Sequence, residues 1–88
     1  DGTITSFDPK GSKSTLGRAI NAQGTVVGSF EDSGGADHGF VRAPDGTIAP
    51  VDIPGAMSIE VEGINKKGVI VGDYTDSGYM LHGFVLSP

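Results

Sequence analysis

The sequence predicts an all-β repeat protein, and three observations support this prediction. Residues 1–44 and 45–88 align end to end without a gap, and 20 of the 44 aligned pairs are identical. Fifteen glycines and five prolines indicate many tight turns. No segment carries apolar residues at helical spacing over three turns. Because a repeat of this length is typical of propeller blades, we expect a β-propeller with four strands in each blade.

The strands follow from the turn residues that separate them. In the second repeat we expect strands at residues 47–51, 60–64, 69–74 and 82–86. The turns at 44–46 and 65–68 end in a glycine that can supply the positive φ of a tight turn. Residues 55–62 could suggest a helix, but Met57, Ile59 and Val61 alternate with polar residues, which favours a strand with one wet face. The matching residues 13–18 are less regular.

Composition limits the chain to one small domain, residues 1–88, with repeat 1 at 1–44 and repeat 2 at 45–88. A core of this size is marginal unless something such as oligomerisation adds to it. There is no cysteine, so no disulfide or thiolate site is available. The net charge of −5 argues against nucleic acid. The longest apolar run is too short to cross a bilayer, so we expect a soluble chain without a membrane partner.

Several motifs resemble a known repeat. The motif GINKKGVIVGDY at 63–74, preceded by DIPGA at 52–56 and followed by HGFV at 82–85, resembles the HAF-type repeats of bacterial extracellular proteins. The first copy departs from this pattern at Ala19 and at residues 9–12. The resemblance covers essentially the whole chain. It implies a strand-rich, propeller-like array whose natural parent is extracellular or at the cell surface, and it implies no established activity.

The phase of the repeat divides one blade between the two ends of the chain. If the propeller comparison holds, the innermost strands end at Ile20 and Ile64, and the outermost strands lie at 3–7 and 47–51. Only one blade, about residues 18–52, is then continuous, and the other is divided between the N-terminal segment and residues 62–88. Pro88 followed by Asp1 would restore the turn at 44–46. The chain therefore looks like an excised or engineered segment of a longer array.

Two blades cannot surround an axis, because propellers usually carry about four to eight. We therefore expect head-to-tail assembly of the chain with itself, in which the N-terminal strand of one copy completes the last blade of the next. Three copies would give six blades and four would give eight. Two copies could also close a ring, which would have four blades.

Some residues recur at one phase of the repeat, and we interpret them as structural positions. They are Asn21, Asn65, Gly28, Gly72, His38, His82, Phe40 and Phe84. Histidines near aspartates could also act as general bases or metal ligands. A catalytic dyad needs one site, whereas these histidines recur in each repeat. The structural interpretation is therefore favoured, and we expect no enzyme, no cofactor and no metal.

Three residues are candidates for ligand contact. Asp32 and Asp76 lie in oxygen-rich loops, where calcium binding is weighed against the favoured role of turn stabilisation. Tyr79, whose repeat partner is Gly35, begins an apolar stretch that could contact a partner or glycan, although packing on an adjoining blade is favoured. The main prediction is a structural module that assembles by strand exchange. The alternatives are a lectin-like, ligand- or glycan-binding extracellular propeller and, less favoured, a hydrolase.

Overall fold

The computed structural model describes residues 2–88, and in this range it contains strands and no helix, which confirms the all-β prediction. The seven strands are β1 (Ser12–Ile20), β2 (Val26–Asp32), β3 (Asp37–Arg42), β4 (Ile48–Val51), β5 (Ala56–Ile64), β6 (Ile70–Asp76) and β7 (Leu81–Leu86).

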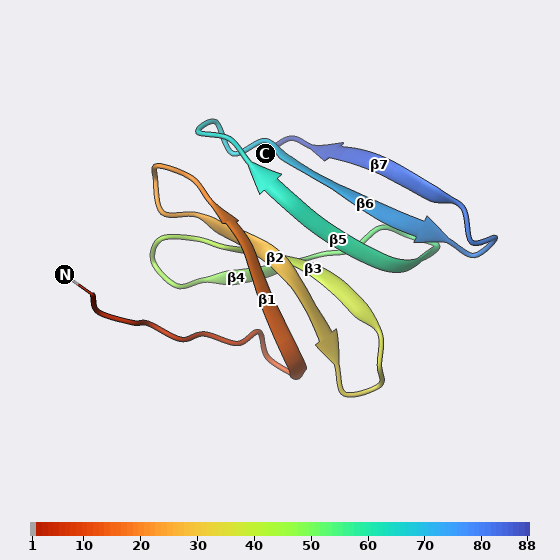
Figure 1. Ribbon diagram of the computed structural model, residues 1–88, viewed down its shortest axis with the longest axis horizontal. Coiled ribbons are helices and arrows are strands. Elements are labelled where there is room, and N and C mark those ends of the chain that lie inside the picture. The colour runs from red at the N-terminus through yellow and green to blue at the C-terminus, as the bar shows by residue number, and fades with distance from the viewer. Residues whose placement is uncertain (1) are drawn as a thin grey trace.

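The strands form two antiparallel sheets in which chain neighbours are also sheet neighbours (Figure 1). The first sheet has the order β1-β2-β3-β4 and the second has the order β5-β6-β7. The second sheet lacks a counterpart of β4, so β7 is an edge strand. Residues 2–11, which include the repeat counterpart of β4, form no strand in the single chain. The described chain is therefore an open pair of sheets and does not itself close a ring.

The turn after each inner strand is built in the same way in both repeats. The side-chain oxygen of Asn21 accepts hydrogen bonds from the backbone N–H groups of Gln23 and Thr25, at 3.1 and 3.0 Å. Asn65 does the same for Lys67 and Val69, at 2.9 and 3.0 Å. Asparagine is favoured at such positions because its short side chain can bond the backbone two residues further on. The recurring asparagines therefore start the β1–β2 and β5–β6 turns.

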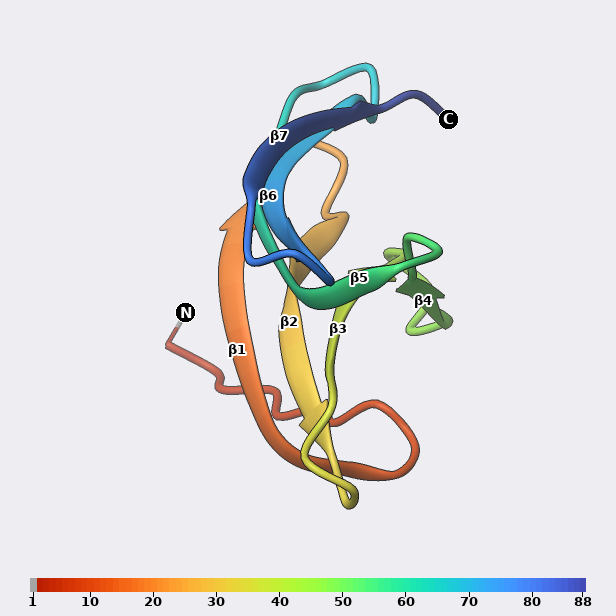
Figure 2. The ribbon, with the colours of Figure 1, turned by 90° about the vertical axis from the view of Figure 1, so that its right-hand side faces the viewer.

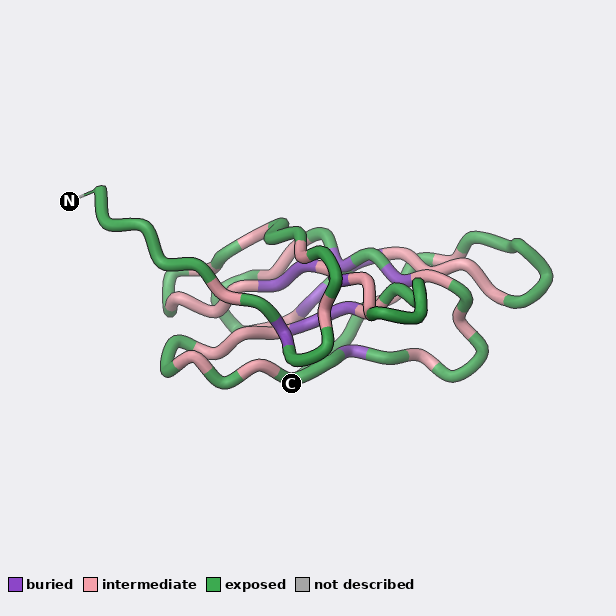
Figure 3. Tube along the Cα trace, turned by 90° about the horizontal axis from the view of Figure 1, so that it is seen from below, coloured by how far each residue is buried: buried purple, intermediate pink, exposed green. Residues whose placement is uncertain are grey.

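The core lies between the sheets, where β5 packs across β1, β2 and β3 (Figure 2). Val27, Ile59, Val61 and Ile70 form its buried centre, and the buried residues gather in the middle of the chain trace (Figure 3). Gly39 permits this close approach, because a Cβ there would lie 2.6 Å from a methyl group of Val61. Burial of each such side chain contributes about 1.5–3 kcal/mol.

The inner strands are longer than the sequence predicts. β1 begins at Ser12, whereas we expected the first blade to begin near residue 18, and β5 begins at Ala56 instead of 60. The period-two interpretation of residues 55–62 is confirmed as a strand, with Ile59 and Val61 buried. Met57 departs from it and is 48% exposed, because the register shifts between Ala56 and Ser58. A bulge inserts one extra residue into a strand, and that residue has no partner on the neighbouring strand.

Candidate functional site

The recurring Gly–Phe pairs are packing positions. Gly28 in β2 faces the ring of Phe40 in β3, and a Cβ at Gly28 would overlap the carbonyl oxygen of Leu16 and lie 2.9 Å from that ring. Gly72 faces Phe84 in the same way, and a Cβ there would lie 2.9 Å from the Phe84 ring. Glycine at these positions lets the ring pack closely against the middle strand of each sheet.

His38 lies between two carboxylates in the first sheet. Its Nδ1 is 2.6 Å from Asp52, which directly follows β4, and its Nε2 is 2.9 Å from Asp32 at the end of β2. The ring also stacks on Phe30 at 5.0 Å. The hydrogen bonds that the carboxylates accept from the ring, chiefly that of Asp52 and then that of Asp32, raise the pKa of His38. In turn, the hydrogen bond from His38 lowers the pKa of Asp32. Both ring nitrogens donate when the imidazole is protonated.

His82 has only half of this arrangement. Its ring stacks on Tyr74 at 4.9 Å, and its Nε2 is 2.8 Å from Asp76. The hydrogen bond from His82 lowers the pKa of Asp76. Within residues 2–88, however, the Nδ1 of His82 has no hydrogen-bond partner. In the repeat, the position that Asp52 holds beside His38 corresponds to Asp8.

The structure places Asp32 and Asp76 in turns. Asp32 accepts hydrogen bonds from the backbone N–H groups of Gly34 and Ala36, at 2.9 and 3.0 Å. Asp76 accepts the equivalent bonds from Gly78 and Met80, at 2.8 and 3.0 Å. Each carboxylate is thus engaged by its own turn and by one histidine. Among the described residues, no group of three or more metal-ligand side chains forms a candidate metal site.

Tyr79 lies at the tip of the β6–β7 turn. It is 78% exposed, and its neighbours Met80 and Leu81 are 62% and 69% exposed. Its φ of 65° lies in the left-handed region, which Gly35 occupies in the first repeat at 86°. Within its own chain, Tyr79 therefore does not pack on an adjoining sheet.

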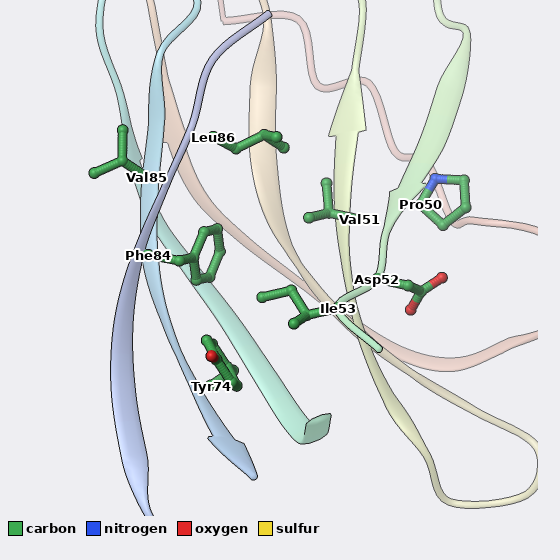
Figure 4. Close-up of a pocket in the computed structure, with 8 residues that line it drawn as sticks. All are labelled: Pro50, Val51, Asp52, Ile53, Tyr74, Phe84, Val85 and Leu86. Carbon is green, nitrogen blue, oxygen red and sulfur yellow. The ribbon is translucent and has the colours of Figure 1, made fainter. Parts of the chain in front are cut away.

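A groove borders the edge strand of the second sheet (Figure 4). Its volume is about 430 Å³, and its apolar wall includes Val51, Ile53, Tyr74, Phe84 and Leu86. The equivalent space beside the first sheet is about 150 Å³, and its lining includes Pro9, Phe30, Ile48 and Pro50. Two of these residues belong to β4. The larger groove is also lined by two residues of β4, Pro50 and Val51, and it borders β7, beside which the second sheet has no fourth strand.

The N-terminal segment contacts the first sheet through Phe7 and Pro9. Phe7 packs edge-on against Phe40, with ring centroids 5.6 Å apart, and the Arg42 guanidinium lies 5.1 Å from the centre of the Phe7 ring. Pro9 is buried. In contrast, residues 2–6 are exposed, and Ile4 is 89% exposed. Its repeat counterpart Ile48 is half-buried in β4. The segment is held beside the first sheet but does not join it.

Equivalent positions differ in exposure between the two repeats. Val27 is fully buried, whereas Val71 is 45% exposed. Val41 is half-buried, whereas Val85 is 68% exposed. The opposite holds for Ile20, which is 65% exposed, while its counterpart at residue 64 packs on the core. Each sheet thus leaves exposed the face whose counterpart is covered in the other sheet.

Sequence reasoning singled out the two histidines but missed Asp52, which contacts His38 from the end of the outer strand. Asp8 and Asp52 are an identical pair in the alignment, as His38 and His82 are. This shared identity was the signal in the sequence that could have linked the aspartates to the histidines. It does not show contact by itself, because the contact depends on the register of β3 with β4.

The fold and this site define an all-β repeat protein with one four-stranded sheet and one three-stranded sheet whose edge is open. Comparison of the chain with protein-family models, curated proteins and solved structures gives no match. Among the described residues, no helix has the length and apolar character needed to cross a membrane.

Proposed function

We propose that this protein is a non-enzymatic structural module that assembles head to tail into a closed β-propeller. In this assembly the N-terminal strand of one copy becomes the fourth strand of the second sheet in another copy. The observation that carries the proposal is the three-stranded second sheet, because the repeat assigns its missing strand to residues 3–7. Unpaired strand edges are a ready template for pairing with another chain.

The pairing of β3 with β4 gives the register of the proposed contact. In the first sheet Gly39 pairs with Val51 and Arg42 pairs with Ile48. The 44-residue shift then pairs Gly83, Phe84, Val85 and Leu86 with Phe7, Ser6, Thr5 and Ile4 of another copy. This register brings the exposed Ile4 to the groove of Figure 4, at the position that Ile48 takes beside the first sheet.

The turns that follow the inner strands support the same head-to-tail arrangement. The Asn21 side-chain amide donates a hydrogen bond of 3.0 Å to the backbone oxygen of Asn65, which links the two inner turns. Within residues 2–88, the side-chain amide nitrogen of Asn65 has no hydrogen-bond partner. Its equivalent acceptor is the backbone oxygen of Asn21 in the next copy. The junction inside the chain thus supplies a template for the junction between chains.

A head-to-tail contact generates a ring when its rotation closes. Three copies would form six blades and four copies would form eight, and both numbers lie within the usual range of about four to eight blades. Two copies would form a four-bladed ring. The mass of the assembly therefore gives the number of blades directly.

The first test is the solution mass of the chain at micromolar concentration, measured by light scattering or sedimentation. We expect a single species of three or four copies, with two as the other closed solution. A folded monomer at this concentration would overturn the proposal.

The second test uses two proline variants of the exposed segment. Pro50 occupies the position that corresponds to Ser6, so Ser6→Pro should permit pairing. Thr5 corresponds to Ala49, whose neighbour in β3 is Val41. Because hydrogen-bonded and non-bonded pairs alternate along an antiparallel ladder, Thr5 should need the N–H that proline lacks. Thr5→Pro should therefore abolish assembly, and Ser6→Pro should retain it.

Both proline variants should keep the circular dichroism of the folded chain, since residues 2–6 form no strand in the single copy. If Thr5→Pro assembles as well as the parent chain, residues 3–7 are not the exchanged strand.

A further inference from the structure

The first sheet shows how an outer strand places an aspartate beside a histidine. Gly39 pairs with Val51, the last residue of β4, and this pairing brings Asp52 to the Nδ1 of His38 at 2.6 Å. The contact therefore depends on the presence and the register of the fourth strand.

The second sheet has the same histidine without that strand. In the proposed register, Gly83 pairs with Phe7 of another copy, which places Asp8 of that copy next to His82. Asp8 is exposed and accepts a hydrogen bond of 2.8 Å from the Thr15 hydroxyl through its Oδ1. Its Oδ2 makes no hydrogen bond within residues 2–88. One carboxylate oxygen is thus available for a second donor.

We propose that Asp8 of one copy bridges to the Nδ1 of His82 in another copy, and that this contact makes assembly depend on protonation of His82. The inference rests on the proposed strand exchange and adds a specific contact and a means of regulation to it. His82 would then lie between Asp76 of its own chain and Asp8 of the other copy, as His38 lies between Asp32 and Asp52.

The proton requirement follows from the donor count. A neutral imidazole has one N–H, whereas a bridge between two ionised carboxylates needs two. The charged groups that act on His38 are Asp52 and Asp32. On His82, β6 presents Asp76 and the ring of Tyr74, and β5 places the uncharged Ala56 opposite Asp76. Asp8 of the other copy adds the second negative charge. Closing the bridge therefore favours the protonated ring.

The direction of the pH effect follows from linkage. If the assembled state binds more protons than the free chain, assembly strengthens as pH falls and weakens as pH rises. The limit is one proton for each contact, which corresponds to about a tenfold change in the contact's dissociation constant per pH unit. Measurements between about pH 6 and 8.5 stay in the range where carboxylates are ordinarily ionised.

The experiment measures the dissociation constant of the assembly by sedimentation across this pH range. The variants are Asp8→Asn and His82→Gln, and the matched control is Asp52→Asn, which makes the same change in charge but removes a contact within one chain. We expect the parent chain and Asp52→Asn to assemble several-fold more weakly at pH 8 than at pH 6. Asp8→Asn and His82→Gln should show a flat pH profile.

The outcomes separate the two proposals. If the chain assembles with the same dissociation constant at pH 6 and pH 8, the inference about His82 is wrong, but the proposed ring assembly is not contradicted. A chain that is monomeric at every pH overturns the strand exchange itself. If Asp8→Asn fails to assemble, nitrogen NMR of the parent assembly at about pH 7.5, above the ordinary pKa of histidine, decides. Two protonated ring nitrogens on His82 support the bridge, and a neutral ring contradicts it.

Discussion

At the residue scale, the stability of the first sheet depends on the charge of one histidine. When protonated, His38 donates to Asp52 after β4 and to Asp32 at the end of β2, so a single ring ties the outer strand to the middle strand. Removing one carboxylate would leave a ring nitrogen without its charged partner. The bridge is local, but it holds the residue that directly follows β4, a strand of four residues.

The pKa shifts predict the pH range in which this bridge acts. The pKa of His38 is raised in the folded state, chiefly by Asp52, so its contribution to stability is complete below about pH 6.5 and is lost as pH rises through the folded pKa. The pKa of Asp32 is lowered, chiefly by His38, so its contribution is present above about pH 4 and is lost as pH falls.

We therefore expect His38→Asn to remove the alkaline loss of stability. Urea unfolding in a Thr5→Pro background, which should keep the chain monomeric, gives the free energy of unfolding from pH 5 to pH 9. The parent background should lose stability above about pH 6.5, and His38→Asn should be less stable below that pH but flat across it. Equal slopes for both chains would contradict the assigned role of His38.

At the element scale, the β6–β7 hairpin carries a strained residue that the β2–β3 hairpin avoids. Tyr79 adopts a φ of 65°, where Gly35 holds the equivalent position. A residue with a Cβ pays about 1–2 kcal/mol in the left-handed region. Tyr79 is also 78% exposed, so little burial offsets this cost in the single chain.

Tyr79→Gly should therefore stabilise the monomeric Thr5→Pro background by about 1 kcal/mol, measured as a shift of the urea midpoint. Gly35→Ala is the reciprocal control and should destabilise it by a similar amount, because a Cβ at Gly35 meets no atom within 4 Å and only the backbone term changes. If Tyr79→Gly instead lowers stability, the tyrosine makes a contact that favours its left-handed backbone.

The elements also show what the sequence can predict. Turn residues and β-branched runs gave the strands of the second repeat to within a few residues, because each turn needs a particular side chain such as Asn65 or a glycine. The strand ending at residue 64 was placed at 60–64, but the alternation of residues 55–62 also indicated a strand there, and the structure joins the two as β5, with bulges near its two ends. The contact of Asp52 with His38 was missed because it depends on pairing across strands, which leaves no periodic pattern along the chain.

At the scale of the whole molecule, the N-terminal segment would serve two neighbours. Phe7 packs on Phe40 of its own chain, while residues 4–7 would pair with β7 of another copy. A circular permutation changes which of these contacts is intermolecular. Residues 9–88 followed by 1–8 would supply the fourth strand to the second sheet in the same chain. The packing of Phe7 on Phe40 would then cross between copies.

We expect the permuted chain to form a ring of the same mass, because the faces that pack between sheets are unchanged. Its monomer should be more stable to urea than the monomeric Thr5→Pro chain, since both sheets then have four strands and β7 is no longer an edge strand. Its ring should dissociate at least about tenfold more readily, because the strand ladder no longer joins copies. Sedimentation over a dilution series measures both mass and dissociation. A permuted chain whose second sheet gains no stability would show that residues 3–7 do not pair with β7 in either arrangement.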